Sequence, residues 1–320
     1  MNISFVIITN GKKPDELSWV LKSIEHQKIK NYEIFISGHL ENQEDFSWAN
    51  YTFVDSKEAA DKGNLAEMRN RACEKAQYDL ILLLDDDMVL SSTFYEKLLE
   101  HGSDFDILTS KVVLPDGTRF WDHCCYQDPK RGHIILEADE DAENLYMSGG
   151  MAWIMKKNVF EKLRWDSKTY DYYNMSNLKD YKEGKHNEDT DFAKRCREAG
   201  FKIKHYNDMI SYHADPSYTG VGRMVRRRKN GRTHEWVKNF DVYFSTKAIA
   251  QFASELFNNG DQAEAADVLR FAMKHHYHDY SLSKLWEELE GKLGKTLTDT
   301  EWNENGCEMY LKDIELYKKS

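Results

Sequence analysis

The chain has little proline and little cysteine, and it has no long apolar run. Only 4 prolines occur in 320 residues, which argues against long linkers within the chain. The 5 cysteines include no Cys-x-x-Cys pair, so neither a disulfide framework nor a cysteine-ligated zinc site is indicated, and we expect reduced thiols and a cytoplasmic location. No apolar run approaches the roughly 18 residues of a membrane-spanning helix, and we expect the first residues to form a strand rather than a signal peptide.

Basic residues are also in the minority. Acidic residues outnumber them by 55 to 44, which gives a formal net charge of -11. This balance disfavours general binding to polyanions such as nucleic acid, although it allows a local basic patch. The apolar content of 41% is typical of a soluble globular protein, and the length fits one large domain with a smaller appendage.

Strand patterns and helix patterns alternate over the first 235 residues. This alternation predicts a Rossmann-like α/β fold for residues 1–235. From about residue 240 the patterns are helical alone, which predicts a small all-α domain at 236–320 that contains one tetratricopeptide-like hairpin. The expected strands lie at 3–8, 32–37, 51–55, 79–84, 106–114, 152–155 and 201–206, and the main helices of the first domain follow Pro14 and lie at 64–77, 92–100 and 188–199.

Three consecutive aspartates, Asp85 to Asp87, follow the apolar strand pattern LILLL. Two carboxylates about 4 Å apart repel by roughly 4 kcal/mol at an effective dielectric constant near 20, so a tight cluster needs a cation, water or protonation. A solvated strand end with diverging aspartates is the plain alternative. Ligands of open α/β sheets lie beyond the carboxyl ends of the strands, where the stretch 9–11 and Ser37 are also expected. Mg²⁺ or Mn²⁺ with a substrate diphosphate is therefore the expected occupant.

Further stretches surround the aspartates in an order that resembles the GT-A fold nucleotide-sugar glycosyltransferases, most like family 2, over about residues 1–225. The triplet matches the DxD signature of that family. The stretch GNLAEMRNRACEKA resembles its glycine followed by an Arg-Asn helix, and SGGMAWIM resembles its acceptor-side glycine segment. HNEDTDFAKRCREAGFKIKH resembles its Glu-Asp helix, and ISYHAD supplies a histidine after that helix.

The resemblance implies a metal-dependent, inverting transfer of a sugar from a nucleotide-diphosphate donor, expected to be a UDP-sugar, to a hydroxyl of a glycan, lipid-linked or other acceptor. It implies Mn²⁺ or Mg²⁺ as cofactor and Asp189 as the general base, with Asp191 as the weaker candidate. The expected metal ligands are Asp87 and His213; the expected acceptor contacts are Glu188, Gly149 and Gly150; the expected donor contacts are Thr9, Asn10, Gly11, Ser37, Gly63, Arg69, Asn70, Asp85 and Asp86.

Structural alternatives accompany several of these assignments. Glu188 and Asp189 would also suit a helix N-terminus on charge grounds alone, Arg69 could be a surface ion-pair residue, and His213 could be an ordinary buried histidine. The family usually has an aspartate-rich end on its second strand for the nucleobase, whereas this chain reads ISGHLEN there, which leaves the base open.

Other functions remain open at this stage. The basic run GRMVRRRKNGR at 222–232 is typical of a solvated loop, but it could close over a donor diphosphate or grip a polyanionic acceptor such as modified nucleic acid. A nucleotidyltransferase would also bind metal and nucleotide on an α/β sheet, although ITNGKKPDEL is a poor version of its glycine-rich loop. A non-catalytic sugar-binding module is the alternative outside enzymes.

Overall fold

The structure is a computed structural model, and it describes part of the chain. The described residues are 1–113, 122–128, 132–135, 145–146, 152–168, 188–214, 228–229, 232–233, 253–260 and 304–319, together with single helical positions between 262 and 291. The two expected acceptor glycines, Gly149 and Gly150, and nearly all of the basic run at 222–232 lie outside these residues. The predicted division into domains 1–235 and 236–320 stays a prediction.

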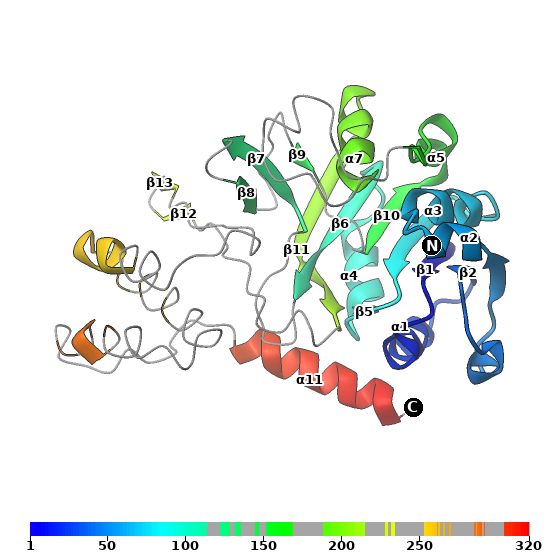
Figure 1. Cartoon of the computed structure of the whole chain (residues 1–320), viewed down its shortest axis with the longest axis horizontal. Coiled ribbons are helices and arrows are strands. Elements are labelled where there is room, and N and C mark those ends of the chain that lie inside the picture. Colours follow the sequence, from blue (N-terminus) through cyan, green and yellow to red (C-terminus); the bar gives the residue numbers. More distant parts are fainter. Residues whose placement is uncertain are drawn as a thin grey trace.

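An eight-stranded mixed sheet forms the centre of the described part (Figure 1). In order across the sheet, the strands are β3 (Thr52–Asp55), β2 (Tyr32–Gly38), β1 (Ile3–Thr9), β4 (Leu80–Asp85), β10 (Trp153–Lys156), β6 (Ile107–Val113), β11 (Ile203–His213) and β5 (Met88–Leu90). The four strands from β3 to β4 are parallel, whereas β10 runs antiparallel to both of its neighbours. β11 is parallel to β6 and antiparallel to β5. Every residue of β1 is buried, as expected for an interior parallel strand.

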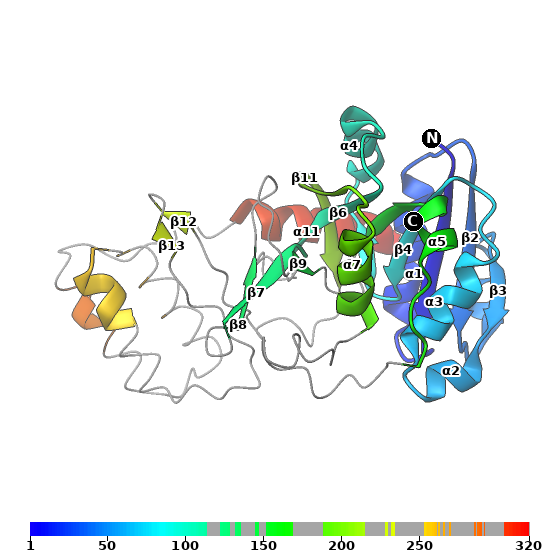
Figure 2. The same cartoon turned by 90° about the horizontal axis from the view of Figure 1, so that it is seen from above.

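Helices cover this sheet and position its loops. α3 packs on β1 and β2 and contacts α7, whereas α1 packs on β5 and contacts α11. The two perpendicular views of Figures 1 and 2 both show α2 and α3 beside β2. The helices are α1 (Pro14–His26), α2 (Lys57–Asp61), α3 (Leu65–Cys73), α4 (Phe94–His101), α5 (Lys157–Lys162), α7 (Glu188–Glu198) and α11 (Glu304–Lys319), with a short 3₁₀ helix η1 (Gln43–Phe46).

Two small sheets complete the described strands. β7 (Cys124–Asp128) pairs with β8 (Gly132–Ile135) and with β9 (Leu145–Tyr146), and β12 (Arg228–Lys229) pairs with β13 (Arg232–Thr233). Within the described residues, no helix is long and apolar enough to cross a membrane.

The predicted α/β fold is confirmed, and three elements differ in detail. The last strand was predicted to end near Tyr206, but β11 continues to His213 after an irregularity between Tyr206 and Ile210. Exposed polar residues at the irregularity broke the apolar pattern from which the strand was predicted. β5 is only three residues long, and α11 lies beyond the helices that the sequence patterns indicated.

Candidate active site

The three aspartates lie at the end of β4 and in the turn before β5, and each carboxylate has a different partner. Arg69 Nη2 donates to Asp85 Oδ1 at 3.3 Å. Thr9 Oγ1 donates to Asp86 Oδ2 at 2.6 Å. Lys13 Nζ contacts Asp87 Oδ2 at 2.5 Å.

Burial makes ionisation of two of these carboxyl groups costly. Burial raises the pKa of Asp85 to about 6, even though the Arg69 charge lowers it. Burial, followed by the negative charge of Asp87, raises the pKa of Asp86 to about 7. The strand end therefore carries a charge density that a cation would relieve, as the sequence predicted.

Asp87 and His213 meet because β5 and β11 are paired. The Ala214 amide donates to the Asp87 carbonyl at 2.7 Å, and His213 is opposite Met88 in the strand register. His213 Nδ1 is 3.7 Å from Asp87 Oδ2, and both side chains are less than one-tenth exposed.

These two residues fit a divalent metal as part of its ligand set. A carboxylate and an imidazole suit Mn²⁺, and the Lys13 ammonium on the same oxygen already marks a place for positive charge. Among the described residues no group of three or more His, Cys, Asp and Glu side chains could hold a metal. Water and substrate phosphates would have to complete the coordination, as they commonly do for Mg²⁺.

Arg69 links the aspartates to the start of α7. Its side chain is 5% exposed and forms a short ion pair through Nη1 with Glu188, which is 2% exposed. Because Arg69 also contacts Asp85, one buried guanidinium holds a carboxylate from each region. The alternative of Arg69 as a surface residue is wrong, since it is buried.

Asp189 and Asp191 have different surroundings on the first turn of α7. Asp189 is buried, and its Oδ1 accepts hydrogen bonds from the Thr190 amide at 2.6 Å and from the Thr190 hydroxyl at 3.3 Å. Asp191 forms an ion pair with Arg195 one turn later, with an oxygen–nitrogen distance of 2.6 Å.

The remaining predicted donor residues divide into two groups. Thr9 and Gly11 lie next to the aspartates, since the Gly11 amide donates to Thr9 Oγ1 at 3.0 Å. Asn10 is exposed beside them and accepts from the Lys12 amide. A Cβ at Gly38 would lie 1.8 Å from the Thr9 carbonyl oxygen, so glycine is required for β1 and β2 to end this close together.

The second group makes contacts within the protein. Ser37 Oγ is 2.9 Å from Ser56 Oγ, and both serines are buried. The side-chain amide of Asn70 exchanges two hydrogen bonds with the Trp165 backbone, at 2.8 and 3.1 Å. Gly63 has a positive φ of 67° just before the Asn64 cap of α3.

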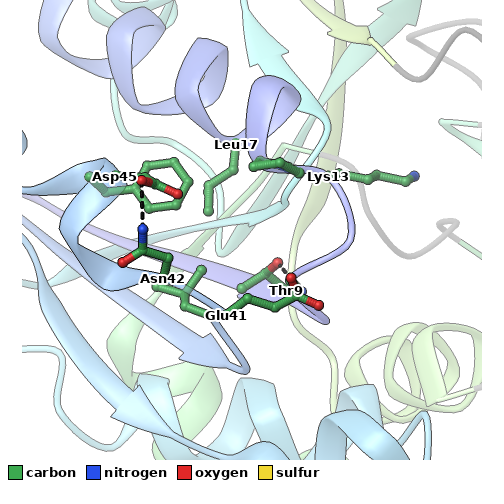
Figure 3. Close-up of a pocket in the computed structure, with 10 residues that line it drawn as sticks. Thr9, Lys13, Leu17, Glu41, Asn42 and Asp45 are labelled. Carbon is green, nitrogen blue, oxygen red and sulfur yellow. Dashed lines mark hydrogen bonds between the residues drawn. The ribbon is translucent and has the colours of Figure 1, made fainter.

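A pocket of about 100 Å³ opens beside Thr9, between the start of α1 and the segment after β2 (Figure 3). Asn42 and Asp45 lie on one wall and are joined by a hydrogen bond of 2.8 Å. The sequence analysis missed these two residues and Lys13. The pocket is lined by Thr9, Gly11, Lys13, Pro14, Leu17, Leu40, Glu41, Asn42, Asp45 and Phe46.

The missed residues had weak sequence signals. Lys13 follows the first strand by only a few residues, which is the expected distance for a ligand-binding loop. The ISGHLEN stretch offered no aspartate at the strand end itself, and the carboxylate of the pocket comes from Asp45, further along the chain in η1.

A Rossmann-like sheet with an acidic turn and a pocket at its carboxyl edge is the arrangement of a nucleotide-binding α/β enzyme. Residues 4–232 match the family model described as glycosyltransferase like family 2, and the chain belongs to this family of glycosyltransferases. The resemblance inferred from the motifs is thereby confirmed. Membership also favours a glycosyltransferase over the nucleotidyltransferase considered from the sequence.

Solved structures of three descriptions are similar to this chain. The crystal structure of S. aureus TarS 1-349 is 13% identical, with 99% of this chain and 89% of that chain covered and a TM-score of 0.47. The same TarS region in complex with UDP-GlcNAc is 13% identical, with 99% and 90% covered and a TM-score of 0.44. HddC from Yersinia pseudotuberculosis is 14% identical, with 67% and 91% covered and a TM-score of 0.38. No curated protein sequence matches the chain.

Proposed function

We propose that this glycosyltransferase moves a sugar from a nucleoside diphosphate donor, preferably a UDP-sugar, to an acceptor hydroxyl with inversion at the anomeric carbon. The reaction depends on Mn²⁺ or Mg²⁺. The observation that carries the proposal is the convergence of the Asp87 carboxylate and the His213 imidazole, 3.7 Å apart, at the strand edge next to the pocket.

The pocket beside β1 takes the nucleoside of the donor. Leu17, Leu40 and Phe46 offer apolar surface to a planar base, while Asn42 and Asp45 offer hydrogen-bonding groups to its edge. Lys13 lines the same pocket and contacts Asp87, so the donor diphosphate would lie between the base pocket and the aspartates. The Lys13 ammonium can exchange the carboxylate for a phosphate oxygen.

Asp87 and His213 would hold the divalent metal, with phosphate oxygens and water as its other ligands. The metal supplies Lewis-acid stabilisation of the departing diphosphate. Asp85 and Asp86 stay near the ribose and the metal site respectively, since Arg69 orients the first and Thr9 orients the second.

Asp189 is the proposed general base, and Glu188 is the proposed acceptor contact. Asp189 is buried at the start of α7, where the helix dipole favours the ionised form that can accept a proton. Glu188 is held beside it by Arg69, and Asp191 is engaged by Arg195, which favours Asp189 over Asp191.

A screen of nucleotide sugars for thermal stabilisation, with Mn²⁺ and with EDTA, tests the proposal. A donor present at a hundred times its dissociation constant adds about 2.7 kcal/mol to the free energy of unfolding. We expect Mn²⁺-dependent stabilisation by a UDP-sugar and, with an acceptor, a product of inverted configuration by NMR. Equal stabilisation in EDTA, or a product that retains the donor configuration, contradicts the proposal.

A further inference from the structure

The C-terminal helix α11 places a buried carboxylate between two strands of the sheet. Asp313 is 3% exposed, and its Oδ2 accepts hydrogen bonds from the Ser92 amide at 3.0 Å and from the Tyr212 hydroxyl at 2.9 Å. Near the end of the same helix, the Tyr317 hydroxyl donates to the Leu90 carbonyl at 2.9 Å. One helix therefore binds the carboxyl end of β5 and the carboxyl end of β11.

These two strands carry the proposed metal ligands. β5 begins directly after Asp87, and His213 is the last residue of β11. Tyr212, whose hydroxyl binds Asp313, is the neighbour of His213 in the chain. A displacement of either strand would change the 3.7 Å separation of Asp87 and His213.

β5 needs support from outside the sheet. It is a three-residue strand at the sheet edge, and in the described sheet it pairs with β11 alone. α11 supplies that support and also contacts α1, the helix that starts beside Lys13 (Figure 1). The Tyr317 ring is 5.7 Å from the His26 ring, and the Lys318 ammonium is 5.0 Å from the centre of the Trp19 ring.

The hydrogen bond of Asp313 is built to stay intact. Burial, followed by the negative charge of Asp313, raises the pKa of Tyr212, so this phenol remains a donor across the working pH range. Because both donors meet one oxygen, the strands cannot separate without breaking at least one buried hydrogen bond.

We propose that Asp313 is a positioning residue for the donor site: by joining Ser92 of the β5 end to Tyr212 of the β11 end, it fixes the spacing of Asp87 and His213. The C-terminal helix is then required for catalysis, although it contributes no group to the reaction. This inference rests on the proposed function, because it assigns a role to the two proposed metal ligands.

Full-length variants of one position separate hydrogen bonding from packing. Asp313→Asn keeps an oxygen that can accept from both donors, whereas Asp313→Leu has a similar size and accepts from neither. Tyr212→Phe removes one donor and keeps the ring that packs at 5.5 Å against Tyr310. Glu315→Gln is the matched control on the same helix, because Glu315 is exposed and pairs only with Lys319 one turn later among the described contacts.

Two measurements are made on each variant that circular dichroism shows to be folded. Hydrogen exchange of the segments 86–92 and 209–214, without ligand, reports the strands themselves. Titration calorimetry with UDP and Mn²⁺ reports donor affinity. We expect faster exchange and about a tenfold loss of Mn²⁺-dependent affinity in Asp313→Leu, a smaller loss in Tyr212→Phe, and values near wild type in Asp313→Asn and Glu315→Gln.

The outcomes distinguish this inference from the proposed function. Unchanged exchange in Asp313→Leu overturns the inference, and so does faster exchange with unchanged Mn²⁺-dependent affinity, since α11 would then only stabilise the fold. If Asp313→Leu does not fold, Tyr212→Phe decides the matter by the same two criteria. A wild-type protein that binds no nucleotide contradicts the proposed function, while the exchange measurement still tests the link between α11 and the strands.

Discussion

Replacing Arg69 by methionine tests whether one buried guanidinium holds the donor and acceptor regions together. Arg69 is 5% exposed and contacts Glu188, which is 2% exposed, and Asp85, which is 27% exposed. The substitution leaves Glu188 buried without its cation. Removing one partner of a buried ion pair typically costs about 3–5 kcal/mol, because the remaining charge is uncompensated.

The expected loss can be measured by urea denaturation and by thermal unfolding. For a domain of this size, about 1 kcal/mol corresponds to roughly 2–4 °C, so Arg69→Met should lower the unfolding temperature by about 10 °C. Arg71→Met is the matched control on the same helix, since Arg71 is 43% exposed and pairs with Glu67 one turn earlier. An exposed pair of this kind contributes about 0–1 kcal/mol.

A second substitution checks the cause of the loss. Adding Glu188→Gln to Arg69→Met removes the uncompensated charge and should recover part of the lost stability. If Arg69→Met and Arg71→Met differ by less than about 1 kcal/mol, the buried pair does not hold the two regions together and the reasoning fails.

Two further predictions concern single carboxylates. Asp189→Asn should keep donor affinity but lower turnover by about a hundred- to ten-thousand-fold, whereas Asp191→Asn should stay within about threefold of wild type; the reverse order in steady-state kinetics would reassign the base. In EDTA, Asp86→Asn should raise the unfolding temperature at pH 8, because the pKa of Asp86 is about 7 in the fold against about 3.9 unfolded. Wild-type stability from Asp86 is present below the unfolded pKa and is lost as pH rises through the folded pKa, so the gain should shrink at pH 5; an equal gain at both pH values contradicts the assigned shift.

Local sequence patterns predicted the elements whose burial is regular. The uninterrupted apolar run of β4 and the helical spacing after Pro14 give β4 and α1 as expected. The antiparallel direction of β10 could not be predicted, because periodicity carries no information on strand direction. β5 was missed because its three residues form a strand only through pairing with β11, more than a hundred residues later.

The site shows the same division between local and long-range information. Motif order brought Asp87, Glu188 and Asp189 to attention, and each is buried at a strand or helix end. The contact between Arg69 and Glu188 spans 119 positions in the chain, and that between Tyr212 and Asp313 spans 101. Such contacts depend on how complete elements pack, which no short pattern encodes.

The most direct test of the account is the Mn²⁺ dependence of UDP binding in Asp87→Ala, measured by titration calorimetry. Asp61→Ala is the control, because Asp61 is an exposed aspartate that pairs with Lys57 on the helix surface. We predict that Mn²⁺ strengthens UDP binding to wild type and to Asp61→Ala but not to a folded Asp87→Ala, since the variant lacks the carboxylate proposed to hold the metal. The same Mn²⁺-dependent affinity in Asp87→Ala as in wild type would show that the acidic turn after β4 is not the metal site.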